Sequence, residues 1–192
     1  MLRIISGTRK GARIAEVDRK NTRPTTDKNK EMLFNILGQY FTGGVCVDLF
    51  AGSGSLGFEA LSRGFSQCYF VDDSREAIRT ITENRDKLKF REGEDCIIIH
   101  ADWRAFIKQA HHTLYSLILA DPPYAFTEHE CLLRKIVEAN ILTDGALVVL
   151  ETGSNTVVTA VLRNLRLLRT RTAGSTKYHL YEFVPDRSPK EE

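Results

Sequence analysis

A short apolar run that breaks into glycines is the feature that most constrains this chain. Residues 45–50 are apolar and rich in strand-forming types, and a helix-like pattern resumes over residues 56–63. Between them, Gly52, Gly54 and Gly57 have the spacing G-x-G-x-x-G, in which glycine permits a tight bend and a close approach of ligand to backbone. The sequence therefore predicts a buried strand, a tight turn and a helix whose free N–H groups favour an anionic group. This pattern alone fits a cofactor site and a merely structural turn about equally well.

The rest of the chain alternates between strand and helix patterns and ends in a hairpin. Further strands are expected at residues 68–71, 96–100, 116–120 and 146–150, and helices at residues 74–88, 103–110, 127–139 and 154–162. Strands that alternate with helices predict a parallel sheet with helices on both faces. Residues 165–172 and 177–184 are joined by only four residues, too few for a helical crossover, so an antiparallel hairpin is expected there.

Length and charge indicate one domain with a basic extension. The 192 residues suffice for one well-buried domain but not for two. We assign residues 1–24 to a basic N-terminal β-hairpin extension, 25–184 to the α/β domain with a first helix over 26–37, and 185–192 to a polar tail expected to be disordered. Residues 1–30 hold nine Lys and Arg against three Asp and Glu, a net charge of +6, although the whole chain has +2. This asymmetry suits a polyanionic partner, with solvated surface charge as the alternative.

The sequence does not have the features of a membrane, disulfide-rich or metal-binding protein. No apolar run approaches the roughly 20 residues that cross a bilayer, and Met1 does not open a signal peptide, so we expect a cytoplasmic protein without membrane contact. The four cysteines are widely spaced, which favours reduced core cysteines. The five histidines lack ligand spacing, and no metal site is expected.

Acidic residues follow several of the expected strands, where ligands of open α/β sheets bind. Asp72 lies twenty residues after Gly52, and an acid at that spacing accepts hydrogen bonds from ribose hydroxyls; Asp73, which also fits a helix cap, is the alternative. Asp102 is placed to accept from an adenine amino group beside Trp103, or simply to cap the next helix. Nicotinamide dinucleotides and S-adenosylmethionine both contain that ribose, so these acids do not separate the two cofactors.

The tetrapeptide Asp121-Pro122-Pro123-Tyr124 follows the fourth strand. Its prolines hold the backbone extended and remove two N–H donors, which leaves a carboxylate and bare carbonyls at the ligand edge of the sheet. This array only accepts hydrogen bonds, so its complement is an NH₂ group that donates to Asp121 and to the Pro122 carbonyl. Tyr124 offers an aromatic face to a planar base. The turn is predicted to orient an amine rather than merely to end a strand.

Several motifs together resemble a class I S-adenosylmethionine-dependent amino-methyltransferase, and specifically the RsmD-type family. They are Asp48-Leu49-Phe50-Ala51-Gly52-Ser53-Gly54-Ser55-Leu56-Gly57, Asp72, Asp121-Pro122-Pro123-Tyr124, Arg3-Ile4-Ile5-Ser6-Gly7, Thr22-Arg23-Pro24-Thr25-Thr26-Asp27 and Leu33-Phe34-Asn35-Ile36-Leu37. The family methylates guanine N2 in bacterial 16S ribosomal RNA, and the resemblance covers about residues 2–184.

This resemblance implies a fold and a set of roles. The fold is a Rossmann-like, seven-stranded, mostly parallel sheet of order 3-2-1-4-5-7-6, with strand 7 antiparallel and helices on both faces. The implied cofactor is S-adenosylmethionine. Its binding residues would be Asp48, Phe50, Gly52, Ser53, Gly54, Asp72, Asp102 and Trp103, and the catalytic residues Asp121, Pro122, Pro123 and Tyr124.

The implied partner is 16S ribosomal RNA in assembled or assembling small subunits, bound by a protein expected to be a monomer. Arg9, Lys10 and Arg23 are expected to contact RNA phosphates. The chain departs from the family at residues 27–30, Asp-Lys-Asn-Lys instead of the more usual Asp-Arg-Val-Arg, and at residues 100–102, His-Ala-Asp instead of Gly-Asp. These departures concern the details of RNA contact and of the adenine pocket.

Three other functions share parts of the pattern. A nicotinamide-dependent oxidoreductase would use the glycine turn but would leave residues 121–124 without a role. Adenine-N6 DNA or RNA methyltransferases and protein-glutamine methyltransferases share the chemistry, but they usually have a target-recognition insert or an Asn in place of Asp121. A non-catalytic RNA-binding module would not require the four residues of the proline turn.

Overall fold

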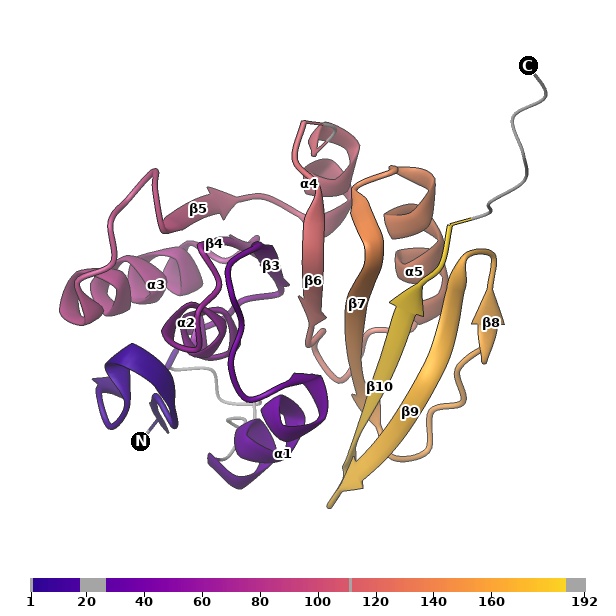
Figure 1. Cartoon of the computed structure of the whole chain (residues 1–192), viewed down its shortest axis with the longest axis horizontal. Coiled ribbons are helices and arrows are strands. Elements are labelled where there is room, and N and C mark those ends of the chain that lie inside the picture. Colours follow the sequence, from indigo (N-terminus) through magenta and orange to yellow (C-terminus); the bar gives the residue numbers. More distant parts are fainter. Residues whose placement is uncertain (1, 18–26, 111, 186–192) are drawn as a thin grey trace.

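A computed structural model describes residues 2–17, 27–110 and 112–185, and these form one central sheet flanked by helices (Figure 1). The sheet has eight strands in the order β5-β4-β3-β6-β7-β10-β9-β8. They are β3 (Val45–Leu49), β4 (Gln67–Asp72), β5 (Cys96–His100), β6 (Tyr115–Ala120), β7 (Leu142–Gly153), β8 (Val161–Leu162), β9 (Leu165–Ala173) and β10 (Thr176–Phe183). The strands from β5 to β7 are parallel, and β10, β9 and β8 continue the sheet in antiparallel pairs.

Helices cover both faces of the sheet. They are α1 (Asp27–Leu37), α2 (Ser55–Ser62), α3 (Arg75–Leu88), α4 (Trp103–Gln109) and α5 (His129–Glu138). The first three pack on one face and the last two on the other, so the sheet separates two hydrophobic cores. Strand β6 serves both cores by alternation, because Leu117 and Leu119 face the first core and Ile118 and Ala120 the second. In the described part of the chain, no helix is long and apolar enough to cross a membrane.

Seven of the strands confirm the predicted sheet. The order 3-2-1-4-5-7-6 corresponds to β5-β4-β3-β6-β7-β10-β9, and β10 is antiparallel to both of its neighbours. The N-terminal hairpin is present in short form, as the two-residue strands β1 (Leu2–Arg3) and β2 (Arg13–Ile14) on either side of a 3-10 turn, η1 (Gly7–Arg9). The polar tail from residue 186 onward lies outside the described residues.

The helix predicted over residues 154–162 is wrong. Strand β7 runs on to Gly153, and the chain then has no regular structure until β8, which pairs with β9 at the sheet edge. Residues 156–159 are Thr-Val-Val-Thr, and β-branched side chains lose χ1 freedom in a helix. Val157 is 92% exposed, so the apolar spacing in this segment does not form a core-facing helix side.

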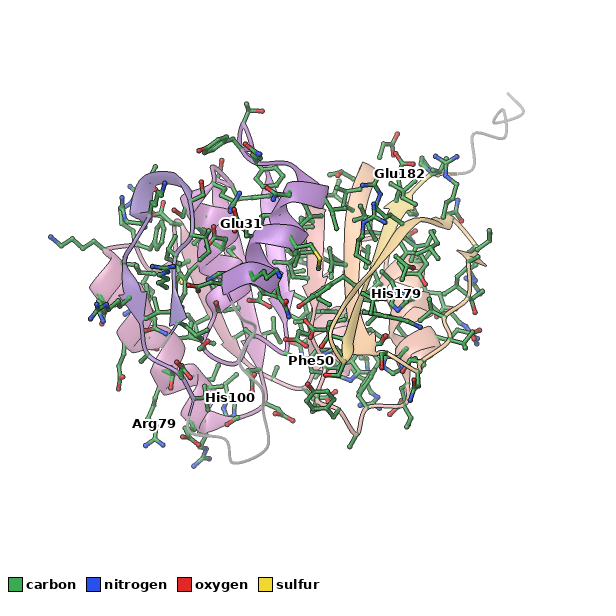
Figure 2. The ribbon with its side chains drawn as sticks, turned by 90° about the horizontal axis from the view of Figure 1, so that it is seen from below. Glu31, Phe50, Arg79, His100, His179 and Glu182 are labelled. Atoms are coloured by element: carbon green, nitrogen blue, oxygen red, sulfur yellow. The ribbon has the colours of Figure 1, made fainter. Side chains whose placement is uncertain are left out.

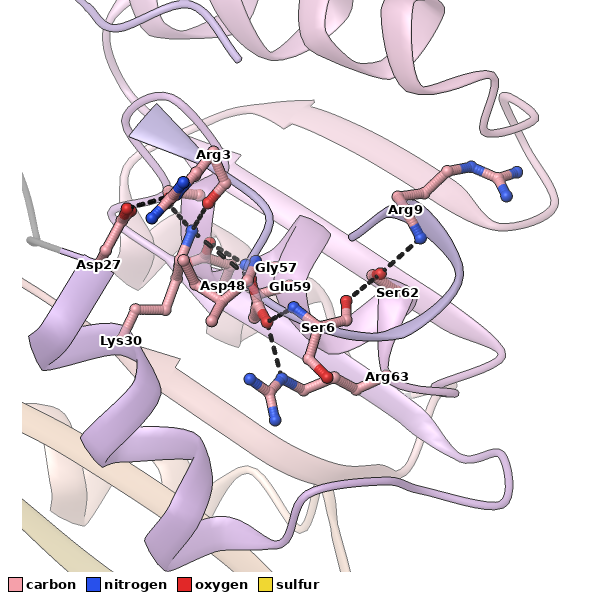
Figure 3. A network of polar contacts seen from close by, with 12 residues as sticks. Arg3, Ser6, Arg9, Asp27, Lys30, Asp48, Gly57, Glu59, Ser62 and Arg63 are labelled. Carbon is pink, nitrogen blue, oxygen red and sulfur yellow. Dashed lines mark hydrogen bonds and ion pairs between the residues drawn. The ribbon is translucent and has the colours of Figure 1, made fainter. Parts of the chain in front are cut away.

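A buried carboxylate joins the N-terminal segment to helices α1 and α2 (Figure 3). Glu59 is fully buried and accepts hydrogen bonds from the backbone N–H groups of Ile5 at 2.8 Å and Ser6 at 3.0 Å. It also accepts from Arg63 Nε at 2.7 Å and lies 3.5 Å from Lys30 Nζ. Burial lowers the pKa of Lys30, and the charge of Glu59 opposes this effect. Lys30 therefore has a structural role, although it is one of the nine basic residues counted in residues 1–30.

Replacing Glu59 by glutamine is expected to lower the free energy of unfolding by about 3–5 kcal/mol, because Lys30 and Arg63 would lose their compensating charge while still buried. Urea unfolding followed by circular dichroism measures this loss. The control is Glu31→Gln, on the exposed side of α1 (Figure 2), which should change stability by less than about 0.5 kcal/mol. Equal effects of the two substitutions would contradict the structural role of Glu59.

Helix α2 packs closely on β4 because Gly57 has no side chain. A Cβ at this position would lie 2.4 Å from Cε1 of Phe70 and 2.8 Å from Sγ of Cys68. Gly57→Ala should therefore cost about 1–3 kcal/mol through overpacking. Thermal unfolding measures this loss of stability. The control is Gly153→Ala, where the nearest atom to a new Cβ lies 3.8 Å away. A Gly57 variant as stable as the Gly153 variant would show that the contact relaxes without cost.

Candidate active site

A cavity of about 680 Å³ opens at the carboxyl ends of β3, β4, β5, β6 and β7. Its volume lies in the range of small-molecule sites. The structure brings together eleven of the predicted residues in its wall: Asp48, Phe50, Gly52, Ser53, Asp72, Asp102, Trp103, Asp121, Pro122, Pro123 and Tyr124. Gly54 is not part of the wall. It precedes the first residue of α2, and its φ of 76° is a left-handed conformation that glycine adopts without strain.

Two carboxylates fix the glycine turn between β3 and α2. Asp48 Oδ2 accepts from the backbone N–H of Gly57 at 2.9 Å, as Figure 3 shows, and Asp72 Oδ2 accepts from that of Gly52 at 2.8 Å. Burial raises the pKa of Asp48 well above its ordinary value; the Gly57 N–H opposes this, and the charge of Asp121 adds to it. The turn is therefore held by side chains at both ends.

Asp72 and Asp73 both line the cavity, but they differ in burial. Asp72 is buried, and its Oδ1 also accepts from the N–H of Ser74 at 2.9 Å. Asp73 is exposed, and its carbonyl contacts His100 Nε2 at 2.9 Å. Ribose binding by Asp72 stays a prediction.

Aromatic rings form one side of the cavity. Phe50 lies at the end of β3 (Figure 2) with a φ of 64°, which is rare for a bulky residue and is typical of functional turns. Its ring is 6.5 Å from that of Trp103 and packs edge-on to Phe126 at 5.4 Å. Phe126 was missed in the sequence, where it stands isolated after the proline turn.

Asp102 caps helix α4, which was the alternative left open in the sequence. Its Oδ1 accepts from the backbone N–H of Arg104 at 2.8 Å, and its Oδ2 lies 3.3 Å from the Arg104 guanidinium. That guanidinium also pairs with Glu128 and lies 4.5 Å above the Trp103 ring. Asp102 still borders the cavity, and its contact with an adenine stays a prediction.

The proline turn places its acceptors at the cavity mouth. The Pro123 carbonyl accepts from the N–H of Phe126 at 2.8 Å, so within this turn the Pro122 carbonyl and the Asp121 carboxylate remain the expected acceptors for an amine. Tyr124 is 62% exposed at the rim, where a ligand ring can reach it.

Glu151, near the end of β7, lies beside this turn and was missed in the sequence. It lines the cavity, and it follows Leu150, which pairs in register with Ala120, the residue before Asp121. Burial and then the charge of Asp121 raise the pKa of Glu151 to about 9. The signal that could have revealed it is the one applied to the other strands, because Glu151 directly follows the apolar residues 146–150.

The cavity is strongly acidic. Its acidic lining residues are Glu16, Asp48, Asp72, Asp73, Asp102, Asp121, Glu128 and Glu151. Among the described lining residues, Arg104 is the one with a lysine or arginine side chain, and it forms ion pairs with Asp102 and Glu128. Such a site favours a cationic ligand and disfavours a pyrophosphate. In the described segments, no group of three His, Cys, Asp or Glu side chains is arranged to hold a metal ion.

Two of the predicted RNA-contacting residues, Arg9 and Lys10, lie outside the cavity wall. Arg9 Nε donates to the Leu88 carbonyl at 2.7 Å, and its guanidinium stacks 5.1 Å from the centre of the Phe90 ring. Arg9 therefore attaches the hairpin to the end of α3. Lys10 beside it is exposed, and Arg23 lies outside the described residues.

Comparisons with known proteins agree with the sequence motifs. The family model Conserved hypothetical protein 95 matches residues 2–182. The candidate rRNA methyltransferase YlbH of Bacillus subtilis is 38% identical over 181 residues, which cover 94% of this chain and 98% of that protein. The ribosomal RNA small subunit methyltransferase D of Haemophilus influenzae is 34% identical over 182 residues, covering 94% and 93%.

The fold leads to the same group of proteins. A solved structure of a candidate methylase from Haemophilus influenzae superposes with a TM-score of 0.81 at 32% identity, covering 96% of this chain and 99% of that one. The predicted family and fold are thus confirmed. The chain belongs to the Conserved hypothetical protein 95 family, the RsmD-type family of S-adenosylmethionine-dependent methyltransferases.

Proposed function

We propose that this methyltransferase transfers a methyl group from S-adenosylmethionine to the exocyclic N2 amine of a guanine in 16S ribosomal RNA. The observation that supports this proposal is that the proline turn and the glycine turn border one cavity. An amine-orienting array thus lies next to a cofactor turn. The Haemophilus influenzae relative is a ribosomal RNA small subunit methyltransferase and YlbH is a candidate rRNA methyltransferase, which favours this substrate over DNA or protein.

The residues of the cavity fit this cofactor. Its acidic wall suits a ligand with a positively charged sulfur, whereas the pyrophosphate of a nicotinamide dinucleotide would face the same acids. When bound, S-adenosylmethionine supplies a methyl group activated by that charge. In this proposal the glycine turn holds the methionine part, Asp72 accepts from the ribose, and Trp103 with the Asp102 region borders the adenine.

The proline turn supplies the catalytic groups. Asp121 accepts one hydrogen bond from the target amine and the Pro122 carbonyl accepts the other, which directs the nitrogen lone pair toward the methyl donor. The Asp121 carboxylate also stabilises the positive charge that develops on nitrogen, so no strong base is needed. Tyr124, exposed at the rim, stacks on the base after it has left its helix or loop.

Ribosomal RNA is the proposed partner, met as an assembling or assembled small subunit by a monomeric enzyme. Lys10 of the N-terminal hairpin is exposed and close to Arg9, so it is a candidate for a phosphate contact. Arg169 and Arg171 on β9 are exposed as well, and Arg171 pairs in register with Tyr178 of β10. These two arginines are further candidates for phosphate contacts.

Replacing Asp121 by alanine is expected to lower methyl transfer at least about 100-fold, because the amine loses its acceptor and its countercharge. Transfer of labelled methyl groups to unmethylated small subunits measures turnover, and calorimetry measures cofactor binding, which should survive. Asp144→Ala, at an exposed position away from the cavity wall, is the control. Near-normal turnover by the Asp121 variant would reject the proposed catalytic role.

Replacing Lys10 by serine is expected to reduce the slope of RNA affinity against salt by roughly one unit, because one phosphate contact is lost. Filter binding over a series of salt concentrations measures this slope. Lys108→Ser, an exposed lysine in α4, is the matched control and should leave the slope unchanged. An unaltered slope for the Lys10 variant would place the RNA on another face.

A further inference from the structure

Three polar side chains stand in a row across neighbouring strands beside the proline turn. Ala120 of β6 pairs in register with Leu150 of β7, so the next residues, Asp121 and Glu151, are neighbours at the strand ends. Glu151 in turn pairs with Tyr178 of β10. Tyr178 belongs to the core on the α1 side of the sheet, and Asn29 of α1 is close enough to influence its pKa. The row therefore links the first helix to the catalytic turn.

The middle of this row is buried and incompletely hydrogen-bonded. Within the described residues, Glu151 Oε2 and the Tyr178 hydroxyl are buried atoms without a hydrogen-bond partner. The Glu151 carboxyl is the neighbour of the Asp121 carboxylate at the strand ends, close enough for the charge of Asp121 to raise its pKa. Two carboxyl groups so close together cannot both be ionised at low cost, so one of them holds a proton. A protonated carboxyl donates one hydrogen bond, whereas an ionised one only accepts.

Glu151 is the group that holds this proton. Burial, followed by the charge of Asp121, raises its pKa to about 9. Burial also raises the pKa of Tyr178, which stays protonated. Thr176 of β10 and Asn29 of α1 add only uncharged groups around the row, while Asp48 of β3 and His129 of α5 line the same cavity.

Resting on the proposed function, we propose that Glu151 is a positioning residue whose carboxyl O–H donates to Asp121 and holds that carboxylate toward the target amine. The shared proton also keeps the pair at a single negative charge. A second ionisation would place two negative charges in contact and would push Asp121 away from the amine. The methyl-transfer step itself is unchanged, because Glu151 acts only through Asp121.

Two substitutions separate hydrogen-bond donation by residue 151 from the effect of its side-chain size. Glu151→Gln retains an N–H donor and is expected to keep kcat within about threefold of wild type, whereas Glu151→Ala should lower kcat at least about tenfold with an unchanged KM for S-adenosylmethionine. Glu83→Gln, an exposed acid in α3, is the control. Wild-type kcat in the alanine variant, or equal losses in the glutamine and alanine variants, would overturn the inference.

The pH profile provides an independent readout. Because the pKa of Glu151 is raised, the donating form is present below about pH 9 and is lost as the pH rises through that value. The wild-type kcat should therefore fall at alkaline pH, and that of Glu151→Gln should fall less. Titration of the RNA affects both proteins alike, so the difference reports on Glu151. Superimposable profiles would contradict the role.

A measurement without substrate distinguishes failure of this inference from failure of the proposed function. Carbon-13 NMR of protein labelled at glutamate carboxyl carbons should show one group that titrates near pH 9 and is missing in Glu151→Gln. If this signal is present but the wild type methylates no guanine, the proposed function is wrong and the protonated pair stands. If no glutamate titrates there, the inference is wrong, whatever the enzyme methylates.

Discussion

The turn between β3 and α2 is held at both ends by carboxylates that belong to the sheet. Asp48 binds the N–H of Gly57, and Asp72, from the next strand, binds the N–H of Gly52. These two bonds set the position of α2 against the strand ends, and the cavity forms where the turn, the aromatic rings and the proline turn meet. The polar groups that shape the turn thus come from the fold itself.

The same design concentrates negative charge. Burial raises the pKa of Asp48, and burial together with Asp121 raises that of Glu151, so the cavity holds acids whose ionisation the fold disfavours. Such an arrangement costs stability and is typical of functional sites. The buried Glu59 network, by contrast, pairs its carboxylate with Lys30 and Arg63 and attaches the N-terminal segment to α1 and α2. The Glu59 carboxylate is thus balanced by buried cations, whereas the acids that line the cavity outnumber its basic residues.

Much of this could be predicted from the sequence, because the relevant signals are local. The strand–helix alternation predicted the parallel part of the sheet and the short link before β10 predicted the antiparallel hairpin, whereas the strand order was implied by the family resemblance. The four strand ends identified part of the cavity wall. The helix over residues 154–162 was wrong because its apolar residues lie at a sheet edge. The burial of Lys30 and the contact of Arg9 with Leu88 arise from tertiary packing, which net charge does not report. Glu151 directly follows the apolar residues 146–150, but its place beside Asp121 depends on the register between β6 and β7.

We propose that this protein methylates a guanine amine in small-subunit ribosomal RNA. Nucleoside mass spectrometry is the most direct test of this activity. The protein and S-adenosylmethionine are incubated together with each of three substrates in turn: free 16S RNA, unmethylated small subunits and adenine-rich DNA. We predict N2-methylguanosine in the RNA or in the subunits. The better of these two substrates identifies the stage of subunit assembly at which methylation occurs. N6-methyladenine in the DNA, or cofactor binding without any methylated nucleoside, would contradict it.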